Sequence, residues 1–375
     1  TLAQLEHPHI VRVYDQRILE SEPMRLLYMQ FVPGGTLADV IKQTSSLPYA
    51  ERSGQTLLQI IDQAVERAGQ SPLDHSTAKG ITANSSWDSV VCQLGIQLAQ
   101  ALDYAHQRGV FHRDIKPANI LMSAAGAALL ADFNVSFDSR LEGASPATFF
   151  GGSLAYMSPE QLEACNPTLS RGPEEVEGRS DLFALGIVLW ELLLGEHPFR
   201  DDRLAGSWLT TLKEMAHRRK TQSPQTPASM TGKSPVAPLI RVLSKCLAPD
   251  PADRFQTGQE LVEALELCLR PRASSLLLVP EEGWQQLVRP QPVPALLLAI
   301  LGPNALAALV NLIYNQQEII SRVPEHAGAF YRTVLLINGI LFPCIILFGY
   351  FASRRLRRRL QRDLKSAGQD KDNSQ

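Results

Sequence analysis

The chain has 375 residues, of which 45% are hydrophobic and 20% charged, and its formal net charge is −2 at pH 7. This composition is sufficient for one large or two ordinary domains with packed cores. Nucleic-acid-binding proteins carry a strong basic excess, so the near-neutral balance argues against nucleic acid as a partner. The chain contains five cysteines: Cys92, Cys165, Cys246, Cys268 and Cys344. They have no C-x-x-C spacing, which indicates free thiols rather than a disulfide framework or a zinc site.

The first part of the chain predicts a small sheet followed by a helix. Residues 10–14 and 25–29 are apolar or alternate over about the length of a strand, with a polar turn between them. Pro33, Gly34 and Gly35 would end the second strand, and Thr36 is suited to cap a helix beginning at Leu37. We interpret this order as a hinge between a small sheet and a helical body.

Several helices are expected in the remainder of the first 270 residues. Residues 44–87 contain one amphipathic helix with polar flanks, which we interpret as an insertion on the domain surface. A helix over 90–108 ends at Gly109, a residue type favoured at helix C-termini. The run 182–194 is almost uncharged, which predicts a helix buried on all sides. Further helical patterns cover residues 207–219, 238–247 and 259–269.

Residues 111–121 place an acid, a cation and an amide within one short stretch. Asp114, Lys116 and Asn119 lie between apolar residues, where buried charges would need partners, so a rigid loop is more plausible than a core strand. Asp132 follows the apolar run 127–130 and offers a second carboxylate. Carboxylate and amide oxygens are ligands that magnesium accepts beside phosphate oxygens. The pattern therefore predicts a magnesium–phosphate site.

The composition changes after Arg289. Residues 290–317 and 333–353 contain no Asp, Glu, Lys or Arg, and each window can hold a helix long enough to cross a membrane. We predict a linker over 271–292, transmembrane helices over 293–314 and 333–352, a short non-cytoplasmic loop over 315–332 and a basic cytoplasmic tail over 353–375. These spans imply a two-span membrane protein with its globular part in the cytoplasm and the lipid bilayer as a partner. Two buried core helices are the alternative interpretation.

Three motifs in order resemble the signature set of protein kinases. They are His112-Arg113-Asp114 with Asn119 five residues after the Asp, then Asp132-Phe133, and then Ser158-Pro159-Glu160. The sequence Lys116-Pro117-Ala118-Asn119 is similar to that of the serine/threonine subgroup of kinases. The overall character of the sequence resembles that of bacterial membrane-attached serine/threonine kinases. The resemblance covers residues 1–270 as a kinase domain. It implies an α+β, protein-kinase-like fold with a partial small β lobe and a mostly helical C-lobe, followed by the transmembrane hairpin.

The resemblance also implies chemical roles. Asp114 would act as the base that orients the substrate hydroxyl, and Lys116 would contact the transferring phosphoryl group. Asn119 and Asp132 would bind Mg²⁺, with ATP as the phosphoryl donor and protein Ser/Thr hydroxyls as acceptors. The adenine pocket would be lined by Met29 at its back, by the hinge residues Gln30, Phe31 and Val32, and by Leu121 as its floor.

Other residues would support these groups. His112 and Phe133 are expected to hold the loops by packing, and the resemblance makes Arg113 a further structural residue of this region. Glu160 is expected to pair with Arg254, Asp181 to tie the central helix to the backbone of the 111–121 loop, and Ser153 to help seat the acceptor.

Two departures from the kinase pattern affect the functional interpretation. Asn134 occupies the position of the glycine expected after Asp132-Phe133, and Asn tolerates left-handed backbone angles best among the other residues. No Gly-rich loop and no strand lysine of the V-A-I-K type precede His7. We interpret this as N-terminal truncation of a serine/threonine protein kinase and expect these 375 residues alone to be inactive. The alternatives are a pseudokinase scaffold and, less favoured, a small-molecule phosphotransferase.

Overall fold

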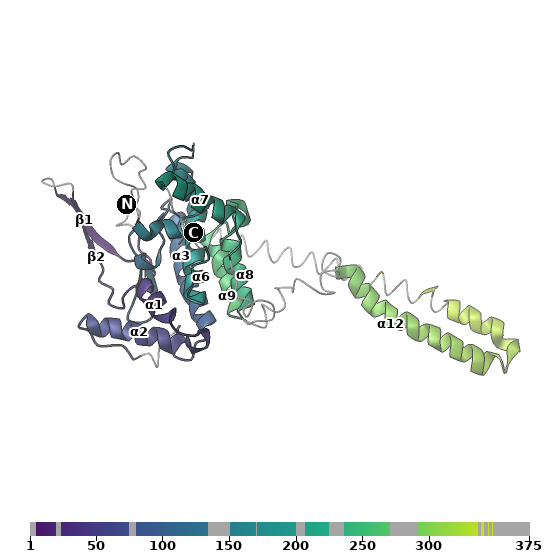
Figure 1. The fold of residues 1–375 in the computed structure, drawn as a ribbon. Helices are drawn as coiled ribbons and strands as arrows, with labels where there is room; N and C mark the ends of the chain where they lie inside the picture. Colours follow the sequence, from purple (N-terminus) through teal and green to yellow (C-terminus); the bar gives the residue numbers. More distant parts are fainter. Residues whose placement is uncertain are drawn as a thin grey trace. The chain divides into compact units, whose positions relative to one another are not determined.

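The structure is a computed structural model that describes residues 5–19, 24–74, 80–133, 151–169, 171–199, 207–224, 236–270, 292–336, 339–340, 344 and 347. The chain divides into two compact units, Thr1–Leu278 and Val279–Gln375. The first unit consists of two-stranded sheets and a helical body, which Figure 1 shows in purple to green. The second contains α12, the light green helix in Figure 1.

Two antiparallel hairpins form the sheets of the first unit. Strands β1 (Val13–Leu19) and β2 (Met24–Met29) pair with a bulge between Val13 and Asp15. The second hairpin joins β3 (Ile120–Met122) to β4 (Ala128–Leu130). The second hairpin lies in sequence between the predicted site residues Asn119 and Asp132.

The first strand begins later than the sequence predicts. Ile10 and Val11 are buried, and they pair with β4 instead of β2: Ile10 forms a parallel bridge with Leu130, and the N–H of Val11 donates to the Leu130 carbonyl at 2.8 Å. Their apolar side chains are buried there, which an edge hairpin could not provide. The chain before β1 therefore connects the first hairpin to the second.

The helices of the first unit follow the predicted order, with α5 (Pro159–Ala164) as an additional short helix that the sequence patterns did not predict. Thr36 caps the first of them with a capping box that includes Asp39. They are α1 (Leu37–Thr44), α2 (Gly54–Arg67), α3 (Trp87–His106), α5 (Pro159–Ala164), α6 (Gly178–Leu194), α7 (Trp208–Thr221), α8 (Ala237–Cys246) and α9 (Gly258–Cys268). Short 3₁₀ turns cover Tyr49–Glu51, Pro117–Asn119, Gly151–Tyr156, Pro173–Glu175 and Pro251–Asp253.

The core is centred on α3 and α6, which pack against each other within the helical body (Figure 1). Nearly every side chain of α6 is buried, as its uncharged sequence predicts. Gly195 has φ 79° and ends this helix in the left-handed region, where glycine carries no steric penalty. The buried α6 provides a rigid support for the loop that precedes β3.

The helix of the 44–87 segment belongs to the core. In α2, Leu57, Ile60, Ile61 and Val65 are buried in the same cluster as α1 and α3. Because these side chains cover one continuous face, α2 extends the helical body and is not only a surface attachment.

The prediction of a transmembrane hairpin is wrong. No helix among the described residues is both long and apolar enough to span a bilayer. Helix α12 (Pro292–Asn315) covers the first predicted span, 293–314, but Gly302, Pro303 and Asn304 interrupt its apolar run midway and Asn311 adds a further amide. The transmembrane part of the predicted fold class, the two-span membrane localisation and the bilayer as a partner are therefore corrected.

The rest of the second unit is described only in part. A π-helical turn over Gln316–Ile320 and a 3₁₀ turn over Pro324–His326 follow α12. Of the second predicted span, 333–352, the structure describes residues 333–336, 339–340, 344 and 347. The basic tail over 353–375 and all of the predicted linker except residue 292 lie outside the described residues.

Candidate active site

Asp181 anchors the 111–121 loop to the central helix. Its Oδ1 accepts the N–H of Arg113 at 2.7 Å and its Oδ2 accepts the N–H of His112 at 2.9 Å. His106, at the end of α3, places Nε2 2.8 Å from Oδ2. Burial acts to raise the pKa of Asp181, but the hydrogen bond and charge of His106, together with contributions from His112 and the N–H of Arg113, outweigh burial and lower that pKa. Asp181 thus links α6 to the loop backbone through an ionised carboxylate.

Arg113 adopts a backbone conformation that is unusual for its residue type. Its φ is 64°, in the left-handed region. Asp181 fixes its N–H, and its carbonyl accepts a hydrogen bond from Nε2 of Gln161 at 3.0 Å. A strained backbone conformation of this kind persists only where several surrounding contacts hold the residue in place. The turn that presents Asp114 is thus held from two separate elements, α5 and α6.

His112 connects the loop to the strand that leads to Asp132. It is fully buried; its Nδ1 accepts the N–H of Asp114 at 3.3 Å and its Nε2 donates to the Ala131 carbonyl at 2.9 Å. Burial lowers the pKa of His112, so the imidazole is neutral with its proton on Nε2. Its ring lies 4.5 Å, centroid to centroid, from that of Phe133. His112 and Phe133 therefore pack together between the two acidic positions.

The structure brings Asp114, Lys116 and Asn119 together. Nζ of Lys116 lies 2.8 Å from Oδ2 of Asp114, and Nδ2 of Asn119 donates to the same oxygen at 3.0 Å. Nδ2 of Asn119 also donates to the backbone carbonyl of Asp114 at 2.9 Å. These contacts fix the orientation of the carboxylate and leave its Oδ1 outside this set of hydrogen bonds.

Asp132 lies next to this group through the backbone. The N–H of Ala131 donates to the carbonyl of Asn119 at 2.9 Å, so the residue after Ala131 emerges beside the loop. Asp132 is exposed and has φ 57°, a second left-handed conformation at a non-glycine residue. With Nδ2 of Asn119 engaged as a donor, its amide oxygen and the Asp132 carboxylate are available as hard oxygen ligands beside the Asp114 carboxylate.

These oxygens fit a metal held jointly with phosphate. Within the described part of the chain, no cluster of three or more His, Cys, Asp or Glu side chains could hold a metal ion. Magnesium is commonly bound through one or two carboxylates plus substrate phosphates rather than by an all-protein cage. The donor set of Asn119 and Asp132 is consistent with that arrangement.

A pocket of ≈ 260 Å³ connects the two acidic positions to the small sheet. Asp114, Asp132 and Phe133 line one part of it. The remaining lining residues are apolar and come from the N-terminal segment, the first hairpin, β4 and the residue after β4: Leu5, Ile10, Val11, Val13, Leu27, Met29, Leu130 and Ala131. An apolar cavity that ends at two carboxylates can accept a flat apolar group with an anionic, metal-bound extension.

The residues expected around adenine lie in two environments. Met29, Val32 and Leu121 pack against one small apolar cluster of Val11, Leu129 and Ala131. Of the expected five residues, only Met29 is among the described residues that line the pocket. The N–H of Gln30 donates to the carbonyl of Arg12 at 2.8 Å, and the Phe31 side chain is 68% exposed. Adenine contacts from the hinge backbone would therefore have to use groups other than the Gln30 N–H.

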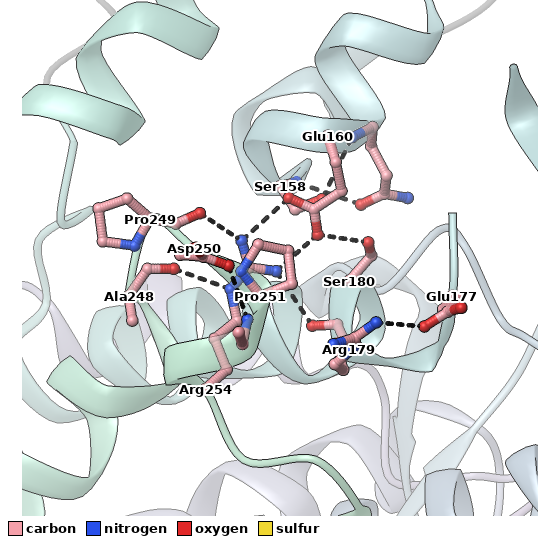
Figure 2. Close-up of polar contacts among 12 residues, drawn as sticks. Ser158, Glu160, Glu177, Arg179, Ser180, Ala248, Pro249, Asp250, Pro251 and Arg254 are labelled. Carbon is pink, nitrogen blue, oxygen red and sulfur yellow. Dashed lines mark hydrogen bonds and ion pairs between the residues drawn. The ribbon is translucent and has the colours of Figure 1, made fainter. Parts of the chain in front are cut away.

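The expected ion pair between Glu160 and Arg254 is present and buried (Figure 2). Nη1 and Nη2 of Arg254 lie 2.5 and 2.9 Å from the two carboxylate oxygens of Glu160. The Ser180 hydroxyl donates to Oε1 of Glu160 at 2.6 Å. Arg254 also donates to the carbonyls of Ala248, Pro249 and Arg179, as Figure 2 shows. The pair thereby joins α5, α6 and the segment before α9.

Two predicted residues cannot be placed in full. Asn134 lies outside the described residues. Ser153 falls in the 3₁₀ turn Gly151–Tyr156, but its side chain lies outside the description. Conversely, sequence reasoning missed His106 and Gln161. Each lies on a helix at a position with no motif of its own, and only the fold brings His106 to the Asp181 carboxylate and Gln161 to the carbonyl of Arg113.

Comparison with known proteins identifies the class to which this fold and site belong. The family model for the protein kinase domain matches residues 1–265. The chain therefore belongs to the protein kinase family.

Its relatives are bacterial serine/threonine kinases. The chain is 31% identical to the serine/threonine-protein kinase PknB of Mycobacterium leprae over 264 residues, covering 69% of this chain and 33% of the relative. It is 27% identical over 265 residues to a probable serine/threonine-protein kinase of Clostridium perfringens, covering 71% of this chain and 30% of the relative. The chain thus spans about a third of the length of these relatives.

Proposed function

We propose that this chain carries the phosphoryl-transfer site of a serine/threonine protein kinase, which moves the γ-phosphate of ATP to protein Ser or Thr hydroxyls. The observation that carries the proposal is the convergence of Lys116 and Asn119 on one oxygen of Asp114. A carboxylate held in this way presents its other oxygen in a fixed direction. Family membership and similarity to bacterial serine/threonine kinases support the same reaction.

Asp114 is proposed to orient the acceptor hydroxyl and accept its proton. Its position is fixed through His112 and through the strained turn at Arg113, so little reorganisation is required during transfer. Lys116 lies close enough to contact an incoming phosphoryl group while it remains paired with Asp114. Preorganised charges of this kind provide most of the stabilisation in phosphoryl transfer, where covalent demands on the protein are small.

Asn119 and Asp132 are proposed to hold Mg²⁺, and family membership implies ATP as the nucleotide. When bound, the magnesium ion would neutralise charge on the phosphates. Asp132 projects into the pocket, whereas Asn119 is buried and fixed by its donor contacts to Asp114. Met29 would lie at the apolar end, where a purine ring can be excluded from water.

Substitution of Asp114 by Asn tests the proposal. In the full-length gene product with Mg²⁺-ATP and a generic protein substrate, we expect Asp114→Asn to reduce the rate of phosphoryl transfer by about 10²–10⁴-fold. This is the usual contribution of a general base. Radiolabel transfer from γ-labelled ATP measures this loss. Asp253→Asn makes the same chemical change on the exposed surface and should retain full transfer. Labelling by wild type that does not exceed that by Asp114→Asn would contradict the proposal, and background labelling by both would favour a pseudokinase scaffold.

We further propose that residues 1–375 alone do not turn over ATP. No lysine or arginine is among the described residues that line the pocket, so no side-chain cation there positions the α- and β-phosphates. The prediction is that this chain labels no substrate above the level of its own Asp114→Asn variant. Measurable, Asp114-dependent turnover by the 375-residue chain would contradict it.

A further inference from the structure

Helices α3 and α9 pack in a fixed antiparallel register. A Cβ placed on Gly258 would lie 2.5 Å from the carbonyl oxygen of Ala99, and one on Gly95 would lie 2.9 Å from Cδ1 of Leu265. The N–H of Gln259 also donates to the Asp103 carboxylate at 3.1 Å. Residue numbers rise along α9 as they fall along α3. One turn further in this register, Cys268 faces Cys92.

The two thiols interact directly. Cys92 is 2% exposed within the main core, and Cys268 packs against that core while partly exposed. The hydrogen bond between them lowers the pKa of the Cys268 thiol and raises that of the Cys92 thiol.

The surroundings of Cys268 favour a thiolate. The guanidinium of Arg241, on α8, lowers the pKa of Cys268, against the opposing effects of burial and of Asp88. Nε of Arg241 has no hydrogen-bond partner within the described residues. A partly exposed cysteine beside a cation is the environment in which thiols react with electrophiles.

We propose that Cys92 and Cys268 form a redox-active thiol pair that a peroxide oxidises to a disulfide between α3 and α9. The Cys268 thiolate attacks one peroxide oxygen, the O–O bond breaks, and the released hydroxide takes up a proton to leave as water. Cys268 is then a sulfenic acid. Sγ of Cys92 attacks Sγ of Cys268, the S–O bond breaks, and the departing hydroxide leaves as water with the Cys92 proton. Two thiols and one peroxide thus give one disulfide and two waters.

Cys246, which is buried, and Cys165, which is partly buried, provide internal comparisons. Burial raises the pKa of Cys165 and of Cys246 to about 12 each. The causes of these shifts include no neighbouring cysteine among the residues that the structure describes. They should therefore be slow to react and should not cross-link.

The experiment treats the folded 375-residue protein with hydrogen peroxide, blocks remaining thiols with a maleimide and maps the peptides by mass spectrometry. We expect a Cys92–Cys268 linked peptide that dithiothreitol removes. Without oxidant, we expect Cys268 to be alkylated by iodoacetamide at least tenfold faster than Cys246. This second measurement needs no substitution and does not depend on the folding of a variant.

Variants separate the two steps. In Cys92→Ala, Cys268 should stop at the sulfenic acid and be captured by dimedone, and in Cys165→Ala the linked peptide should form as in wild type. The proposal is overturned if folded wild type keeps both thiols under peroxide, if the link forms only after urea unfolding, or if Cys268 is alkylated no faster than Cys246. A sulfenic acid in Cys92→Ala together with a link in wild type supports it.

Discussion

Glu160 is a charged residue in an environment with almost no water. It is 5% exposed and its partner Arg254 is 2% exposed. Burial acts to raise the pKa of the Glu160 carboxyl, but the hydrogen bonds and charge of Arg254, helped by the Ser180 hydroxyl, keep that pKa below its ordinary value. The five-donor fork of arginine matches this position, where two carboxylate oxygens and three backbone carbonyls must be satisfied. The pair therefore depends on both charges being present.

The pH dependence of unfolding should report this pair. A carboxyl with a depressed folded-state pKa contributes stability that is fully present above the unfolded value, about 4.3, and is lost as the pH falls through the lower folded value. At pH 7 we expect Glu160→Gln to cost about 3–5 kcal/mol, because Arg254 is left buried without its counter-charge. Below pH about 4.3 the difference between the two proteins should shrink.

Urea unfolding at a series of pH values measures this difference. The control is Glu163→Gln on the same helix, whose side chain is 21% exposed and pairs with Arg171 and Lys220. It should cost about 0–1 kcal/mol, as exposed ion pairs do. A constant difference between wild type and Glu160→Gln down to low pH would contradict the assignment of the shift to Glu160.

At the residue scale, motif spacing was informative where chemistry restricts the residue type. Asp114, Lys116 and Asn119 converge, and Asp181 and Arg254 find the partners expected for them. His106 could not be found in this way, because a histidine on a helix has many uses. Its contact with Asp181 spans 75 residues of sequence and exists only through the packing of α3 on α6.

At the scale of elements, two glycines bring α3 and α9 close together. An added Cβ at Gly258 would lie 2.5 Å from a backbone oxygen of Ala99 and 2.7 Å from Cβ of Asp103, neither of which can rotate away. An added Cβ at Gly95 would meet the side-chain ends of Leu189 and Leu265, each at 2.9 Å. The backbone contact is rigid, whereas the leucine ends can adjust.

We therefore predict that Gly258→Ala destabilises the first unit by about 1–3 kcal/mol, the usual cost of overpacking. Gly95→Ala should cost less, since side-chain rotation relieves its contact and alanine gains about 1 kcal/mol of helix propensity. Gly302→Ala in α12 meets no atom within 4 Å and serves as the control. Thermal unfolding measures all three, and a Gly258→Ala protein as stable as wild type would contradict the prediction.

Element types were predictable where periodicity was long, and their roles were not. The uncharged run of α6 predicted a helix that is buried on all sides, and nearly all of its side chains are buried in the structure. The 44–87 segment gave an amphipathic helix, but sequence alone did not show that its apolar face belongs to the main core. For α12, absence of charge suggested a membrane span, whereas Pro303 and the neighbouring amides reduce its apolar character.

At the scale of the whole molecule, the pocket imposes an electrostatic condition on its ligand. Its charged lining residues, within the described chain, are Asp114 and Asp132, and Lys116 offsets only the first of them. Two like unit charges about 4 Å apart repel by about 4 kcal/mol at an effective dielectric constant near 20. A nucleotide polyphosphate placed beside Asp132 is therefore disfavoured unless a divalent cation lies between them.

We predict that ATP binding to the 375-residue chain depends on Mg²⁺. ATP with Mg²⁺ should raise the thermal unfolding midpoint, because a ligand that binds only the folded state stabilises it by mass action. With EDTA the shift should disappear. Adenosine, which has no phosphates, is the matched control, and its smaller shift should be the same with or without Mg²⁺. In Asp132→Asn, which removes both a proposed metal ligand and the repulsion, the shift with Mg²⁺-ATP should decrease while metal-free ATP binds no worse than to wild type. An equal ATP shift in EDTA and in Mg²⁺ would show that this pocket does not hold the phosphates through Asp132, and the metal assignment would then be wrong.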